Sequence, residues 1–474
     1  MPLDPANLPK TLEECHAFMM EQDSHHREIV TALFQQIAKL QAEIEALKER
    51  LKTDAGNSSL PPSRSRKKPL SNRKPSGRKS GGQPGHKGHF RTLSPAEEVD
   101  KIVLCPLPPR CFCGGEIHIK DKVQLHHVYE LPQMKLHLTE YRLEKGLCTC
   151  CWKNHVASLP QGVPGGITGP NLTALMSHMV SRYQLSRREL REFLREHYDF
   201  KISLGTIFRK QKLVNTALEK PAAGILDAIK KNHCTNMDET GHNRDGKREW
   251  LWGIMSQEAA FFRVFKSRGK KVVAGLMGDY YGIVVTDRYA GYNLFPDDRR
   301  QFCWAHLKRD FTRLSQKSDA IVAGIGRNLL ACQEELFELW HEYGNGEITK
   351  DTFSQKIPGL QTRIEHYLEQ GSHTDPALKT SRFCKNLLEH SDALWTFVSN
   401  DNVEPTNNHA ERCIRPAVTW RKKYFGTRSD YGSEFVGRSM TLIMTCRLQS
   451  KSAFDMLKQT IDRWFLQQEP PLLC

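Results

Sequence analysis

Apolar residues near the start of the chain follow a heptad pattern, with polar and charged residues at the remaining positions. The apolar seam alternates steps of three and four through Val30, Leu33, Ile37, Leu40, Ile44, Leu47 and Leu51. This narrow seam predicts a coiled coil over residues 22–54, through which copies of the chain form a homo-oligomer. The alternative is a helix that packs against its own chain.

Two short amphipathic helices are predicted within residues 165–225. Ser186 and Glu189 have the spacing of a capping box at the start of one helix, and Ser203 is a suitable N-cap for the next. Two capped helices joined by a tight turn predict a helix-turn-helix-like region that binds DNA. Helical hairpins also occur in protein cores, so both interpretations stay open. The basic residues expected to reach a groove or backbone are Arg209 and Lys210.

The period changes to that of β-strands after residue 233. The pattern predicts three strands, at "CTNMDETG", "REWLWGIMS" and "AAFFRVF". A segment with helical spacing follows, "KKVVAGLM", and then a buried strand with an acid at its end, "GIVVTD". This order predicts an α/β core of the ribonuclease-H-like kind over residues 230–450. Helical apolar spacing predicts an all-helical insertion at about 315–400. Residues 451–474 are expected to form a C-terminal tail.

Charge narrows the class of partner. The formal net charge of +15 favours a polyanion, with nucleic acid ahead of an anionic membrane surface. Residues 55–96 contain ten Lys and Arg residues and no acid, which predicts a flexible basic arm that attracts phosphates. The alternative is a solvated linker. The residues of the arm expected to bind DNA are Lys67, Lys68, Arg73, Lys74, Arg78 and Lys79.

No apolar run is long enough to span a membrane, and the N-terminus lacks the pattern of a signal peptide. We therefore expect a cytoplasmic protein without a membrane partner. In a reducing cytosol, most of the 14 cysteines should be small buried apolar residues, and those that cluster are the exceptions.

Clustered cysteines predict a zinc-ribbon-like module over residues 97–160. Two tight groups of cysteines lie about 35 residues apart, and four thiolates would close a tetrahedral structural zinc site. The expected ligands are Cys111, Cys113, Cys148 and Cys151. Cys105 and Cys150 remain alternatives, since the first pair has C-x-C spacing and Cys150 adjoins Cys151.

Three carboxylates carry the candidate chemistry. Asp238 lies on the first predicted strand, and Asp287 ends the fourth, which in such a fold is its neighbour. Two carboxylates brought together repel each other unless they are protonated or bridged by cations, so their proximity predicts Mg²⁺ or Mn²⁺. Glu411, on a helix beginning near Thr406, is the candidate third ligand. Each acid alone is more often structural, and His306 in "CWAHLKRDF" is left outside the triad as a structural histidine.

The chain resembles the large transposases of the insertion-sequence sixty-six family, which are DDE transposases. The resemblance rests on "SGRKSGGQPGHKG", the cysteine module, "MDETG", "VVTDRYAGYN", "CWAHLKRDF" and "NNHAERCIRPAVTWRKKYFGTRSDYGSE". It implies a bacterial, nucleoid-associated enzyme that cleaves and joins DNA, with two Mg²⁺ or Mn²⁺ ions held by the catalytic residues Asp238, Asp287 and Glu411 and with structural Zn²⁺.

The expected DNA partners are transposon terminal repeats and target DNA, with accessory proteins of the same element as possible further partners. Basic residues after the third acid are expected to hold backbone phosphates, namely Arg421, Lys422 and Lys423. We also expect Arg288 and Tyr289 to lie where a substrate phosphate could reach them. Two alternatives stay open: a ribonuclease-H-like nuclease or resolvase without joining activity, and a non-catalytic zinc-containing DNA-binding regulator.

Overall fold

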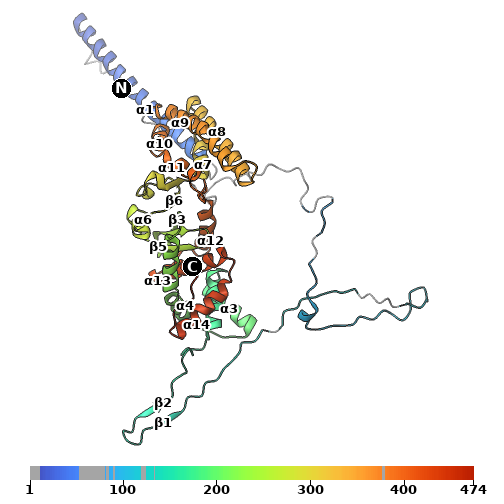
Figure 1. Ribbon diagram of the computed structural model, residues 1–474. Helices are drawn as coiled ribbons and strands as arrows, with labels where there is room; N and C mark the ends of the chain where they lie inside the picture. The colour runs from blue at the N-terminus through green and yellow to red at the C-terminus, as the bar shows by residue number, and fades with distance from the viewer. Residues whose placement is uncertain are drawn as a thin grey trace.

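A five-stranded mixed sheet forms the centre of the protein, as seen in a computed structural model (Figure 1). The structure describes residues 11–52, 81, 85–88, 91–118, 124–132, 134–375 and 379–473. The strands are β3 (Cys234–Arg244), β4 (Lys247–Met255), β5 (Ala260–Phe265), β6 (Ile283–Thr286) and β7 (Arg300–Phe302). Their order is β5-β4-β3-β6-β7.

The first three strands are antiparallel, and β6 and β7 run parallel to β3. Helix α6 (Lys270–Met277) makes the crossover from β5 to β6. This is the strand arrangement expected from the sequence, with β6 beside β3. The expectation did not include β7, a three-residue strand that carries the buried charge of Arg300.

Apolar side chains cover both faces of the sheet. Trp252, Ile254 and Val284 belong to one core, which the helices before the sheet share with α6. Leu251 and Phe262 belong to a second core, on the opposite side of β4 and β5. Successive side chains of a strand point to opposite faces, so the apolar runs of these strands fit a sheet covered on both sides.

Helix α13 (Asp430–Leu448) protects the open edge of the sheet. The hydroxyl of Thr441 accepts a hydrogen bond from the amide of Phe262 at 2.9 Å, and that of Thr445 accepts from Ala260 at 3.1 Å. Gly437 permits this close approach, because a Cβ there would lie 2.7 Å from the carbonyl oxygen of Phe262. The amides of Ala260 and Phe262 on the edge strand β5 are therefore satisfied by side chains of α13, while β4 pairs with the other edge of β5.

Four helices precede the sheet and pack on its first core. They are α2 (Pro170–Ser181), α3 (Arg187–Tyr198), α4 (Leu204–Ala217) and α5 (Glu219–Lys230). The predicted caps are present: Ser186 and Glu189 form a capping box, and the hydroxyl of Ser203 accepts from the amide of Thr206 at 3.0 Å. The two helices of the predicted helix-turn-helix are therefore α3 and α4.

A helical unit follows β7 and has a core of its own. It consists of α7 (Trp304–Ser315), α8 (Ala320–Gly344), α9 (Lys350–Ser372), α10 (Lys379–Glu389) and α11 (Asp392–Ser399). Ile283 and Val285 of β6 join this core, so it covers the β6–β7 half of the sheet. Figure 1 shows the unit at the end of the sheet away from α3, α4 and α14. This agrees with the helical insertion expected between the second and third acids.

The chain returns from the insertion through α12 (Asn408–Tyr424), α13 and α14 (Ala453–Phe465). The predicted C-terminal tail differs from the structure, because α14 lies within it. Helix α14 buries Leu457 and Ile461 and packs against α2. The end of the chain thus belongs to the same core as its first compact helices.

The N-terminal segments have few contacts with this body. Helix α1 (Leu12–Lys52) is a single long helix, and the seam residues Leu33 and Leu40 are about half exposed, at 53% and 51%. Strands β1 (Lys145–Leu147) and β2 (Asn154–Val156) form a small hairpin next to the second cysteine group. Among the helices of the described residues, none is long and apolar enough to cross a membrane.

The loop after α12 is fixed to the turn between β3 and β4. Thr427 donates its amide to the carbonyl of Asn243 at 2.8 Å, and its own carbonyl accepts from Asp245 at 2.8 Å. Gly426 has a φ of +106°, and a Cβ there would lie 2.0 Å from the Asn243 carbonyl oxygen, so only glycine fits. The side chain of His242 lies 3.0 Å from the Thr427 hydroxyl. These contacts tie the end of α12 to the first two strands.

Acid is expected to weaken this attachment through His242. Burial lowers the pKa of His242 to about 4 from an ordinary value of 6.5. The unfolded chain therefore takes up the proton more readily, so this contribution is fully present above pH 6.5 and is lost as the pH falls toward 4. Between about pH 7 and about pH 5, the loss is about 2 kcal/mol of unfolding free energy. Urea unfolding of wild type and of His242→Gln at both pH values measures this loss of unfolding free energy. An equal pH dependence in the two proteins would contradict the assignment.

Candidate active site

The register between β3 and β6 brings two of the predicted acids together. Asn236 pairs with Val285 in this parallel ladder, and the same register continued along both chains sets Asp238 opposite Asp287. Asp287 follows directly after β6, and its carboxylate accepts a hydrogen bond from the amide of Tyr289 at 2.9 Å. Asp238, on β3, and Asp287, in the loop that follows β6, thus lie side by side at the carboxyl end of β6.

The third acid, Glu411, is positioned by the residue that begins its helix. Asn407 is buried at the start of α12, and its side-chain amide donates to the carbonyl of Met237 at 2.7 Å. Its side-chain oxygen accepts from the amide of Asn236 at 2.9 Å. The backbone amide of Asn407 also donates to the sulfur of Cys303 at 3.1 Å. These bonds hold the first turn of α12, and with it Glu411, against the strand that carries Asp238.

Asp238 shows the electrostatic result of this arrangement. Burial raises the pKa of Asp238 well above its ordinary range, and the charges of Glu239, Asp287 and Glu411 raise it further. Since each neighbouring carboxylate disfavours ionisation of the others, the site needs either a proton or a cation. The structure therefore brings all three sequence-predicted acids into one electrostatic cluster.

His306 and Arg309 face Glu411 from α7. The Nδ1 atom of His306 and a guanidinium nitrogen of Arg309 each lie 3.8 Å from the same carboxylate oxygen of Glu411. That oxygen and His306 Nδ1 are both buried and have no hydrogen-bond partner within the described residues. Burial lowers the pKa of His306, which favours the neutral ring. His306, which we expected to be merely structural, therefore lies in the candidate site.

A buried carboxylate oxygen that lacks a hydrogen-bond partner within the described residues, together with two further acids, fits a hard divalent cation. In the described part of the chain, however, no three His, Cys, Asp or Glu side chains are gathered closely enough to hold a metal ion. The donor set matches Mg²⁺ or Mn²⁺ in chemistry, and the acids lie in one region without forming a closed ligand shell.

Arg300 supports the loop of Asp287 from inside the protein. It is fully buried on β7, and its guanidinium donates to the carbonyl of Asp287 at 3.0 Å, the hydroxyl of Thr286 at 3.1 Å and the side chain of Asn293 at 2.7 Å. Burial lowers the pKa of Arg300 to about 10, so the side chain stays charged at neutral pH. No pattern in the sequence predicts this role, because an arginine in a short strand is usually exposed.

A second buried acid, Glu239, adjoins Asp238. It is paired with Arg268 and accepts a hydrogen bond from the hydroxyl of Tyr292. Burial raises the pKa of Glu239 to about 7, the charge of Asp287 raises it as well, and Arg268 opposes both. The guanidinium of Arg268 also lies 3.8 Å from the ring centroid of Tyr289. This network packs the loop of Asp287 against the first strands.

Residues 165–434 match a family described as "Transposase IS66 family", which is more than half of the chain. The chain belongs to the IS66 transposase family. All three acids, His306 and both helices of the predicted helix-turn-helix lie within the matched residues. A second family, described only as a family of unknown function, matches residues 12–92.

Two relatives come from Sinorhizobium fredii. "Uncharacterized protein y4qI" is 24% identical over 281 residues, which are 52% of this chain and 50% of the relative. "Uncharacterized protein y4hP" is 22% identical over 389 residues, 74% of this chain and 69% of the relative. The match to the first spans about half of that protein's length, and neither name adds an activity to the IS66 assignment.

The basic residues expected to bind DNA in this IS66 family member have different surroundings. Arg421 donates to the hydroxyl of Thr240 at 3.2 Å and to the Gly241 carbonyl, beside the site. Lys423 donates to the carbonyl of Gln184 at 2.7 Å, whereas Lys422 is exposed. The predicted arm residues Lys67, Lys68, Arg73, Lys74, Arg78 and Lys79 lie outside the described residues.

The basic residues of α4 and of the Asp287 loop are also engaged. Arg209 is exposed and donates to the hydroxyl of Thr206 at 3.2 Å, while the half-buried Lys210 donates to the carbonyl of Thr168 at 3.4 Å. Arg288, expected near a phosphate, instead pairs with Asp310 of α7 at 2.8 Å. Arg288 therefore joins the strand end to the helical insertion.

The cysteine groups lie on two tight turns. The amide of Cys111 donates to the carbonyl of Gly115 at 2.9 Å, and that of Trp152 donates to Cys148 at 2.9 Å. Hydrogen bonds from the backbone of Gly115 and from Cys111 lower the pKa of the Cys113 thiol. Backbone amides of Cys151 and Cys150 lower that of Cys148. Each predicted pair is thus together, but the two pairs are not gathered into one site within the described residues.

Removing the side chain of Asn407 is expected to separate α12 from β3. In Asn407→Ala, the buried amide of Asn236 and the carbonyl of Met237 lose their partners, which costs about 1–3 kcal/mol of unfolding free energy. Thermal or urea unfolding measures the loss. The matched control is Asn408→Ala, because Asn408 is the exposed neighbour on the same helix turn. Equal stability of the two variants would exclude the proposed anchoring.

Proposed function

We propose that this protein is a DDE transposase that binds the ends of its element and carries out metal-dependent cleavage and joining of DNA. The observation that supports this most is the cluster of Asp238, Asp287 and Glu411, in which burial raises the pKa of Asp238 and the charges of Glu239, Asp287 and Glu411 raise it further. The proposal also rests on membership of the IS66 transposase family. The sheet order β5-β4-β3-β6-β7, with its parallel β3–β6 pair, supports a ribonuclease-H-like core.

The three acids would hold two divalent ions, Mg²⁺ or Mn²⁺. Such ions, when bound, supply Lewis-acid activation of a water or a 3′-hydroxyl and stabilise charge on the phosphate. The protein contributes placement: Asn407 fixes Glu411, and Arg300 fixes the loop of Asp287. Arg309 lies beside Glu411 and offsets part of the negative charge of the acids. The neutral ring of His306 faces the same oxygen and can accept or donate a proton there.

Cleavage and joining should depend on Asp287. The Asp287→Asn variant is expected to retain DNA binding and to lose both cleavage of element-end DNA and strand transfer, by about a hundredfold or more. Gel analysis of products with Mg²⁺ scores both reactions. The matched control is Asp279→Asn, because Asp279 is exposed on the loop before β6 and its replacement changes the charge equally. A fully active Asp287→Asn enzyme would remove this acid from the mechanism.

The same products separate the transposase from a simple nuclease. A ribonuclease-H-like nuclease or resolvase would release a 3′-hydroxyl end without joining it to a second DNA. Strand-transferred product therefore distinguishes the two enzymes, and metal-dependent nicking distinguishes both from a non-catalytic regulator.

We further propose a structural zinc site of Cys111, Cys113, Cys148 and Cys151. The support is that each pair lies on one turn and that the Cys151 thiol, as well as backbone amides, bonds to the sulfur of Cys148. Exposed, heptad-spaced Leu33 and Leu40 on α1 likewise support self-association through a coiled coil.

Zinc content tests the cysteine assignment. Cys111→Ser and Cys148→Ser are each expected to lose bound zinc, because three thiolates hold the ion much less tightly than four. Metal analysis of protein purified without chelator measures zinc per chain. Cys105→Ser and Cys150→Ser serve as controls that should retain it. Loss of zinc in a control would reassign that ligand, and zinc-free wild type would refute the site.

A further inference from the structure

The second helix of the predicted helix-turn-helix is in the middle of a helical cluster. Helix α4 is contacted by α2, α3, α5, α13 and α14, and it buries Ile207, Gln211 and Val214. A recognition helix must present one whole face to a DNA groove. The side of α4 that stays exposed carries two basic residues, Arg209 and Lys212, while its Lys210 donates to the protein backbone.

The first helix of the pair, α3, lies on the outside of this cluster. It packs on α2 and α4 through the buried Leu190 and Leu194. On the exposed side, Arg188, Arg191 and Arg195 recur at steps of three and four, which sets them along one face of the helix. Lys201 follows after the helix and lines a groove beside this face.

On α3, the arginines and the acidic residues form two separate stripes. Glu189, Glu192 and Glu196 lie on an adjacent stripe. Like charges three and four residues apart destabilise a helix, so a merely solvated surface would be expected to alternate the signs. Glu192 makes only a long, exposed contact with Arg195, at 3.8 Å. Among the described residues, Arg188 and Arg191 have no carboxylate partner.

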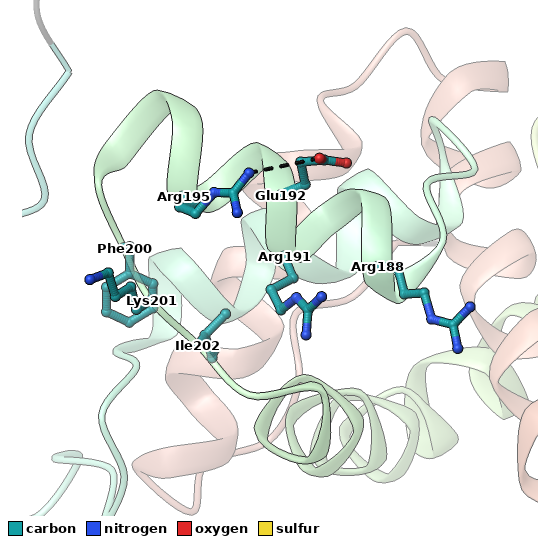
Figure 2. A pocket seen from close by; sticks show the side chains of 7 residues that line it. All are labelled: Arg188, Arg191, Glu192, Arg195, Phe200, Lys201 and Ile202. Carbon is teal, nitrogen blue, oxygen red and sulfur yellow. Dashed lines mark ion pairs between the residues drawn. The ribbon is translucent and has the colours of Figure 1, made fainter.

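The arginine face borders a groove, which Figure 2 shows from close by. Arg188 and Arg191 extend from the same side of α3, whereas Glu192 points to the side where it meets Arg195. Phe200, Lys201 and Ile202 close the other wall from the turn between α3 and α4. The neighbouring Arg187 behaves differently, since its guanidinium donates inward to Gln211 at 2.6 Å. Within the described residues, Arg188 and Arg191 thus have no ion pair that would explain them, and Arg195 has only exposed pairs with Glu192 and Glu196.

We propose that the arginine face of α3, completed by Lys201, binds the phosphate backbone of duplex DNA. This inference rests on the proposed function, of which it identifies the DNA-binding surface. Guanidinium groups match phosphate oxygens in bidentate geometry, and such contacts hold a duplex without reading its bases. Attraction of this kind releases condensed counterions, so its strength falls steeply with salt.

The position of α3 relative to the acids supports this assignment. The carbonyl of Gln184, two residues before the cap of α3, accepts hydrogen bonds from Lys423 and Tyr424 of α12. Tyr424 also donates to Glu189 of the capping box at 3.2 Å. Helix α12 carries Glu411 in its first turn. The start of α3 is therefore bonded to the helix that also carries the third acid.

Salt dependence of DNA binding tests the proposal on the full-length protein. The variant Arg188→Gln/Arg191→Gln/Arg195→Gln is expected to lose affinity for a duplex of the element end by more than about tenfold at moderate salt. The slope of log K against log salt should become shallower by about two to three. The matched control removes three exposed charges from the helical insertion, as Arg327→Gln/Arg382→Gln/Lys385→Gln, and should keep the wild-type slope.

A second variant separates charge from structure. Replacing the three arginines by lysine keeps the charges, so it should restore the salt slope while recovering only part of the affinity. The inference is overturned if the glutamine variant keeps the wild-type slope and affinity, if the control loses as much, if the lysine variant fails to restore the slope, or if wild type binds no duplex. Wild type that binds DNA but neither cleaves nor joins it would instead count against the proposed function and leave the binding result intact.

Discussion

The repulsion among buried carboxylates is the constraint on which the centre of this protein depends. Asp238 lies on β3, Asp287 directly after β6 and Glu411 on α12, and the charges of Asp287 and Glu411 add to burial in raising the pKa of Asp238. The fold keeps them together by contacts made elsewhere on their segments, chiefly through Asn407 and Arg300. An arrangement that opposes its own electrostatics persists only where the surrounding structure determines it, and such arrangements concentrate at functional sites.

Local signals predicted the parts of the site that depend on local order. Short stretches of sequence were enough to predict the strands, from their alternating and apolar runs, and the capping box at Ser186. They also predicted the acid that follows β6. The pairing of β3 with β6 was expected from the ribonuclease-H-like fold class rather than from local order, because the crossover from β5 passes two strands before it reaches β6. The three acids could therefore be selected before their positions were known.

Contacts between distant segments could not be predicted in this way. Asn407 bonds to Asn236, and His306 meets Glu411, each across more than a hundred residues, and a polar residue has no sequence signature for such a partner. Arg300 was missed because its burial depends on acceptors that only the folded loop supplies. The same reason applies to α4: its caps and apolar spacing are local, whereas its contacts with α13 and α14 join segments more than two hundred residues apart.

The length of helix α12 has a further consequence for where the protein would contact its DNA substrate. One end of this helix carries Glu411, and the other end, at Lys423 and Tyr424, is bonded to the segment that begins α3. The helix between these points, which contains Pro416, spans roughly 20 Å, at about 1.5 Å for each residue. That length corresponds to about six steps of a DNA duplex at roughly 3.4 Å each. The distance along the DNA between the phosphate bound by α3 and the phosphate that reacts would then be set by the length of α12. It would not depend on the base sequence.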